Sequence, residues 1–99
     1  MIKHDQHKPP VAKGALCMFP RAIRAVADMS AHGAEKYSWY NWLTVPDAIE
    51  RYGDALVRHV MDEAVDGLID PDSKHLHAAA AAWNALARLE LILREGETK

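Results

Sequence analysis

Histidines and carboxylates recur through the stretch RHVMDEAVDGLIDPDSKHLHA, residues 58–78. His59 and Glu63 are four residues apart, so they share one face of a helix, and Asp66 follows three residues later. A second helix could present His77 to that face. Imidazole and carboxylate groups at this spacing are typical of divalent-metal sites. The alternative is a hydrogen bond between His59 and Glu63 in a partly wet helix interface.

The turn between these histidines carries a second set of oxygen ligands. Asp70, Asp72 and Ser73 lie within four residues, around a proline. Mg²⁺ prefers carboxylate oxygens and keeps several waters, which suits such a turn. Aspartate and serine are also favoured at helix starts, so capping of the next helix explains the same residues.

Four basic residues could bind phosphate groups: Lys8, Lys36, Arg51 and Arg58. Arg51 and Arg58 are seven residues apart and lie one above the other on a helix. Arginine forks and lysine point charges are good phosphate ligands. A solvated helix face is the simpler interpretation of the same pair.

An aromatic segment, YSWYNW at residues 37–42, is flanked by helix breakers and is predicted to be a structured loop. Tyr37 and Trp42 could stack on a nucleobase or wall its pocket. The alternative is that the rings seal one end of a helical bundle.

Three helices are expected to position these groups. The first spans residues 20–33, from a proline start to a left-handed cap at Gly33. The second begins with a capping-box-like pair, Thr44 and Asp47, and continues to about Gly67. The third spans residues 74–94, and the Asp-Ser pair of the preceding turn is expected to cap it.

Helical periodicity predicts which faces of the second and third helices meet. On the second helix, one apolar stripe contains His59 and Glu63 at its middle; its other members are Ile49, Tyr52, Leu56 and Val60. On the third helix, a narrow polar line interrupts an apolar surface; its members are His77, Asn84 and Arg88. Polar side chains therefore point toward the expected core.

Length and composition predict one small all-α domain. The expected architecture is a bundle of about three main helices, residues 20–95, with an extended N-terminal arm over residues 1–19 and a frayed tail over 96–99. A chain of 99 residues buries a modest core, so homo-oligomerisation, as a dimer or larger, is expected to complete it.

The same composition excludes several classes of protein. The net charge of −2 argues against binding a nucleic-acid polymer. No window approaches 18 apolar residues, so no membrane association is expected. The single cysteine, Cys17, cannot form an internal disulfide, which fits a reducing cytoplasm.

Four segments in order resemble one known family: KPP, FPRAIRAVADMSAHGAEKYSWYNW, YGDALVRHV and DPDSKHLHAAAAAWNAL. They are similar to the phage dATP/dGTP pyrophosphohydrolases, the MazZ-type enzymes that carry the dGTP_diPhyd_N domain. The resemblance runs from Lys8 to about Leu91. It implies a small helical enzyme that cleaves a purine deoxynucleoside triphosphate to the monophosphate and pyrophosphate with Mg²⁺ or Mn²⁺, in the host cytoplasm if the protein is phage-encoded.

The resemblance and the residue patterns together give a site assignment. The expected metal ligands are His59, Glu63, Asp66, Asp70 and His77. The expected substrate-binding residues are Lys8, Lys36, Tyr37, Asn41, Trp42, Arg51, Arg58, Ser73 and Asn84. Glu63 or His59 is expected to act as the general base.

One departure from the family pattern bears on catalysis. The family carries a second histidine three residues after His77, and this chain has Ala80 there. Asp72 likewise replaces a glutamate of the family's turn. An alternative function is therefore a catalytically inactive member of the fold that binds a nucleotide or inhibits a host protein.

Overall fold

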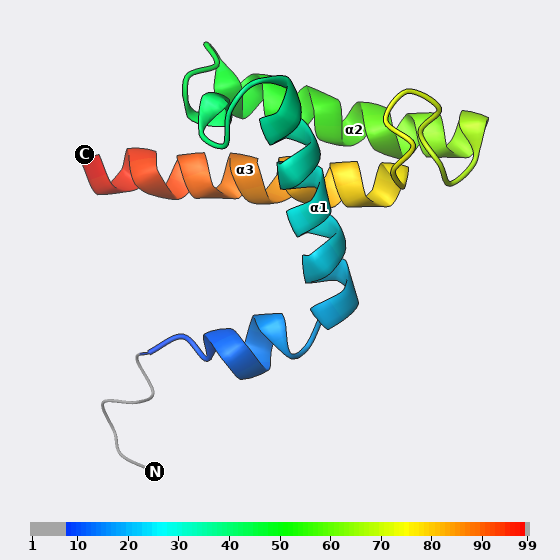
Figure 1. Cartoon of the computed structure of the whole chain (residues 1–99). Helices are drawn as coiled ribbons and strands as arrows, with labels where there is room; N and C mark the ends of the chain where they lie inside the picture. Colours follow the sequence, from blue (N-terminus) through cyan, green and yellow to red (C-terminus); the bar gives the residue numbers. More distant parts are fainter. Residues whose placement is uncertain (1–7, 99) are drawn as a thin grey trace.

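Two long helices, α2 (Ala48–Asp66) and α3 (His77–Thr98), pack side by side, and α1 (Pro20–Lys36) crosses α3 (Figure 1). The computed structural model describes residues 8–98. Two short elements complete the order, the π-helix η2 (Ala12–Leu16) and the 3-10 helix η3 (Asn41–Leu43). The described residues form no strand beyond one isolated bridge between Ile69 and Leu76. The predicted all-α bundle of three main helices is confirmed.

The buried apolar residues of the described chain are all alanines of α3: Ala79, Ala80, Ala81 and Ala87. Small side chains let helix backbones approach closely. On the facing side, Gly53 of α2 lies against Arg88, where an added Cβ would come within 3.1 Å of the arginine Nε. Large apolar residues instead remain exposed on α2 and α3, including Val57, Met61, Val65, Leu89 and Leu93. Oligomerisation stays a prediction that this surface supports.

The ends of α1 and α2 differ from the predicted ones. The first helix continues through Gly33 to Lys36, because alanine, glutamate and lysine after the glycine are good helix formers. The second begins at Ala48, so the predicted capping box at Thr44 is wrong. The Thr44 hydroxyl donates to the carbonyl of Asn41, and Asp47 has left-handed backbone (φ 53°) without a side-chain cap.

The third helix begins at His77 and not at Lys74, so the predicted Asp-Ser cap is also wrong. Lys74 has left-handed backbone with φ of 67°, and the Ser73 hydroxyl accepts from the backbone N–H of His75 inside the loop. The helix continues to Thr98, past the predicted end at Arg94 and through residues expected to fray. Val60 of α2, predicted on the apolar stripe, is exposed.

The structure describes only residues 8–19 of the predicted extended arm, and residues 1–7 of it lie outside the described part of the chain. The described part is not fully extended. Residues 12–16 form η2, because the carbonyls of Pro10 and Ala12 accept hydrogen bonds from Gly14 and Cys17. Figure 1 shows this segment running away from α2 and α3. Within the described part of the chain, no helix is both long and apolar enough to cross a membrane.

Candidate functional site

The loop between α2 and α3 is a short hairpin that holds Asp70 and His77 at its two ends. The N–H of Asp70 donates to the carbonyl of His75 at 2.8 Å, and the N–H of His77 donates to the carbonyl of Leu68 at 2.9 Å. The bridge between Ile69 and Leu76 lies between these bonds. The loop therefore has a fixed backbone, which aims the first residue of α3 back toward α2.

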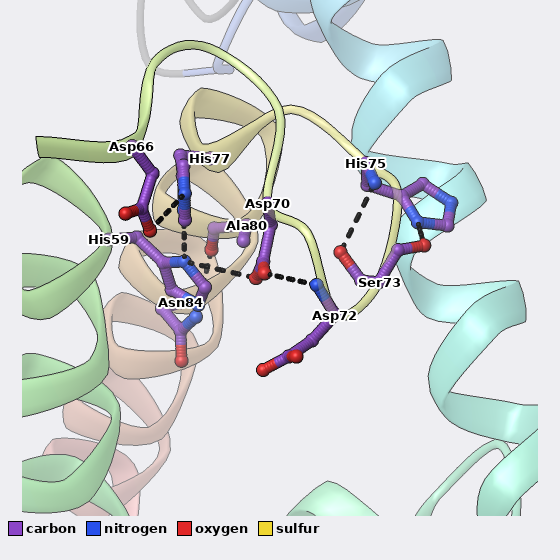
Figure 2. Close-up of polar contacts among 9 residues, drawn as sticks. All are labelled: His59, Asp66, Asp70, Asp72, Ser73, His75, His77, Ala80 and Asn84. Atoms are coloured by element: carbon purple, nitrogen blue, oxygen red, sulfur yellow. Dashed lines mark hydrogen bonds and ion pairs between the residues drawn. The ribbon is translucent and has the colours of Figure 1, made fainter. Parts of the chain in front are cut away.

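His59, Asp70 and His77 converge at this end of the helix pair (Figure 2). The two Nδ1 atoms of the histidines lie 3.0 Å apart, and one Oδ2 of Asp70 lies 3.9 Å from Nδ1 of His59. One ligand atom from each residue falls within 4.8 Å of the others. We call these three residues the His-Asp cluster.

The surroundings favour the neutral form of His59 and the ionised form of Asp70. Burial, with the nearby Arg58 charge, lowers the pKa of His59 below the usual histidine value. A hydrogen bond from the backbone N–H of Asp72 to Oδ1 of Asp70, 2.9 Å long, lowers the pKa of Asp70. These are the protonation states that a metal ligand needs.

His77 is the most deeply buried side chain of the cluster, at 1% exposure. Among the residues that the structure describes, none hydrogen-bonds its Nε2, although such an atom inside a protein normally has a partner. The nearest carboxylate oxygen, Oδ2 of Asp66, is 3.8 Å away, too far for a hydrogen bond. Asp66 thus faces the outer nitrogen of His77 and lies outside the cluster.

The cluster could hold one divalent cation. Ligand atoms about 2.1 Å from a common ion are separated by about 3.0–3.4 Å at octahedral to tetrahedral angles. The distance between the two Nδ1 atoms, 3.0 Å, fits that range, and the 3.9 Å distance to the carboxylate oxygen requires a small rotation. Glu63, expected as a ligand, is half-buried one turn after His59 and is not among the converging atoms.

An aromatic pocket of about 410 Å³ lies between α1, the loop after it and the helix pair. Three residues predicted to bind substrate line it: Tyr37, Asn41 and Trp42. Its other lining residues are Met29, Ser30, Gly33, Ala34, Ser38, Trp39, Val45, Tyr52 and Trp83. The volume is within the roughly 300–1,000 Å³ of small-molecule sites. The prediction of a structured aromatic loop at 37–42 is consistent with this wall.

Tyr52 and Trp83 line the pocket, and sequence reasoning did not place them there. The Trp83 ring lies edge-on to the rings of Tyr52 and Trp42, with centroids 5.5 Å and 6.1 Å away. The Tyr52 hydroxyl donates to the carbonyl of Trp42 at 2.6 Å, and burial raises the pKa of Tyr52. The indole N–H of Trp83 donates to the hydroxyl of Ser30 at 2.9 Å, which ties α1 to α3. The available signal was one aromatic residue on each of the two long helices, Tyr52 on α2 and Trp83 on α3.

The other predicted substrate-binding residues lie beside the cluster, near the pocket, on the N-terminal arm, or in positions already hydrogen-bonded locally. Arg58 is exposed beside His59, and Arg51 is exposed beside Tyr52. Lys36 ends α1 next to Tyr37, whereas Lys8 is exposed and precedes η2. Ser73 and Asn84 are engaged locally: the serine hydroxyl binds the N–H of His75, and Asn84 donates to the carbonyl of Ala80.

The family described as dATP/dGTP diphosphohydrolase, N-terminal, matches residues 2–99. The chain belongs to this family. Comparison with curated proteins and with solved structures finds no significant match. Membership of this N-terminal-domain family connects the chain with a nucleotide substrate. Both the His-Asp cluster and the aromatic pocket lie within the matched residues.

Proposed function

We propose that this chain hydrolyses a purine deoxynucleoside triphosphate, dATP or dGTP, to the monophosphate and pyrophosphate. The observation that carries the proposal is the convergence of His59, Asp70 and His77 on the same helix pair that lines an aromatic pocket of about 410 Å³, in a member of this family. The donors fit a divalent cation. The cation expected from the sequence is Mg²⁺ or Mn²⁺. Such an ion neutralises phosphate charge and lowers the pKa of bound water.

The spacing of the two features suits one nucleotide. Tyr52 and His59 are seven residues apart on α2, about 10 Å along the axis, and Trp83 and His77 are six apart on α3, about 9 Å. A base in the pocket would place the phosphates toward the cluster. Tyr37 and Trp42 would contact the base, and Asn41 would offer it an amide.

The charged residues around the cluster and the pocket would bind the phosphates or transfer a proton. Arg58 projects a permanent positive charge beside His59, where it would hold phosphate oxygens, and Arg51 and Lys36 carry charges near the pocket. Glu63 lies one turn from His59 and remains our choice of general base, with His59 as the alternative. Its half-buried carboxylate would take the proton of the attacking water.

Metal-dependent turnover tests the proposal. Purified protein incubated with dATP or dGTP and Mn²⁺ or Mg²⁺ should release dNMP and pyrophosphate on ion-exchange chromatography, and EDTA should stop the release. His59→Ala should abolish turnover while the helical circular dichroism stays unchanged. His32→Gln is the matched control, because His32 lies on α1 against His75 and outside the cluster. Absence of turnover with every dNTP would refute the proposal.

Ala80 favours a second candidate function, nucleotide sequestration without turnover or inhibition of a host protein. The residue is buried on α3 one turn after His77, where the resembled enzymes carry a histidine, and its carbonyl is occupied by Asn84. Calorimetry separates the candidates: dNTP binding without product indicates sequestration, and no binding indicates a protein partner.

A further inference from the structure

We infer that the His-Asp cluster is selective for transition-metal ions over Mg²⁺, binding Co²⁺ and Zn²⁺ best and Mn²⁺ more weakly, and that Asp66 orients His77 toward the bound ion. The inference rests on the proposed function for its biological purpose. The metal site itself stands on the geometry of four residues.

The types of donor atom in the cluster distinguish transition-metal ions from Mg²⁺. Mg²⁺ demands near-ideal octahedral oxygen ligands and keeps several waters. Imidazole nitrogens suit zinc, iron, nickel and copper, and they are rarely chosen by magnesium. Two of the three converging groups are imidazoles, His59 and His77, and the third is the single carboxylate of Asp70. A donor set of two nitrogens and one oxygen therefore favours a transition-metal ion over Mg²⁺.

Hydrogen bonds and burial hold two of the donors, Asp70 and His77, near ligating positions without an ion. Oδ1 of Asp70 accepts the N–H of Asp72, which leaves Oδ2 directed at His59. His77 begins α3 with its backbone tied to Leu68, and its side chain is enclosed. Three protein ligands leave at least one position for water or a phosphate oxygen, as in metal sites that act on substrates.

The unpartnered Nε2 of His77 is accounted for by the same arrangement. If Nδ1 of His77 binds an ion, the ring proton must reside on Nε2. That N–H would face Oδ2 of Asp66, now 3.8 Å away, and a shift of less than 1 Å would make a hydrogen bond. Metal-bound histidines usually donate their other N–H to a carboxylate in this way, and loss of such a partner costs about 10–100-fold in metal affinity.

Cobalt is the probe, because its visible absorption reports ligand type without nucleotide or turnover. EDTA-treated full chain titrated with Co²⁺ should develop d–d bands that saturate at one ion per chain. Zn²⁺ should displace the cobalt near stoichiometry and Mn²⁺ in excess, whereas Mg²⁺ should fail to do so at about 100-fold excess. Absence of bands, or displacement by Mg²⁺ as effective as by Mn²⁺, overturns the inference.

Two isosteric substitutions place the ion. Asp70→Asn should weaken cobalt binding more than tenfold, roughly, since it removes a charged ligand, and Asp66→Asn should weaken it by about 10–100-fold through His77. Asp72→Asn is the matched control, because its exposed side chain lies in the same turn outside the cluster and its backbone bond to Asp70 is retained. Unchanged binding in Asp70→Asn would overturn the assignment, and unchanged binding in Asp66→Asn would overturn the orienting role.

The result also distinguishes the inference from the proposed function. Selective cobalt binding with no turnover of any dNTP would leave the metal site standing and refute the hydrolase. Turnover supported equally by Mg²⁺, with no cobalt bands, would support the hydrolase and refute the selective site.

Discussion

Removal of the Ser30 hydroxyl should loosen α1 from α3 and weaken the aromatic pocket. The hydroxyl accepts the indole N–H of Trp83 at 2.9 Å in a partly buried setting. Ser30→Ala leaves that donor without its partner, which costs about 1 kcal/mol of unfolding free energy, and up to about 3 if water cannot reach it. Trp83→Phe removes the donor and part of the ring, so its cost should be larger. Both single substitutions remove the same hydrogen bond, so the double variant should lose less unfolding free energy than the sum of the two single variants. The expected difference, the coupling energy, is about 1 kcal/mol.

Urea unfolding followed by circular dichroism measures all four proteins of this cycle. Ser38→Ala is the matched control, because Ser38 is an exposed serine of the same pocket. The reasoning is refuted if the two single substitutions add within about 0.3 kcal/mol, or if Ser30→Ala costs no more than Ser38→Ala. Since the pocket depends on the placement of α1, Ser30→Ala should also reduce dNTP affinity while leaving cobalt binding unchanged.

Two further predictions concern pH and helix packing. In EDTA, the free energy of unfolding should decline as the pH falls below about 6.5, because the lowered pKa of His59 makes the unfolded chain take up that proton first. A second decline should follow below about pH 3.9 as the lowered pKa of Asp70 acts in the same direction. His59→Gln should flatten the first decline in urea titrations at several pH values; an equal slope would contradict the assignment. Gly53→Ala should stabilise the protein by less than about 1 kcal/mol, because the gain in helix propensity is offset by the shift that the new Cβ forces on exposed Arg88. Gly33→Ala should stabilise it more, because the space around Gly33 is open. Equal urea midpoints for the two glycine variants would show that Arg88 moves without cost.

The existence of the three helices was predictable because their periodicity and composition are local properties. Their ends were not, because competing local bonds decided them. Thr44 has the residue type of a cap, yet its hydroxyl binds the carbonyl of Asn41. Ser73 stands before α3, yet the hairpin loop delays the helix until His77.

The cluster was more accessible to sequence reasoning than the pocket. The placement of His59 on an inward stripe and of His77 on the facing helix follows from helical spacing, and the structure brings both together with Asp70. Glu63 lies on the same helix stripe as His59, but its carboxylate does not join Asp70 and His77. Which residues of the stripe join them depends on how α2 packs against α3. Trp83 lines the pocket only because α1 crosses α3 near this residue. The residue spacing within one helix does not predict where or at what angle another helix crosses it.

The two halves of the site belong to parts of the fold that differ in contact order. All three residues of the cluster come from the contiguous hairpin of α2, its loop and α3, whose contacts are local in sequence and should form early in folding. The pocket also needs α1, which reaches α3 through a pairing 53 residues apart, between Ser30 and Trp83. We therefore expect that hydrogen exchange would protect the hairpin amides more strongly than those of α1, and that a chain with α1 undocked could still capture a metal ion while no longer recognising a base.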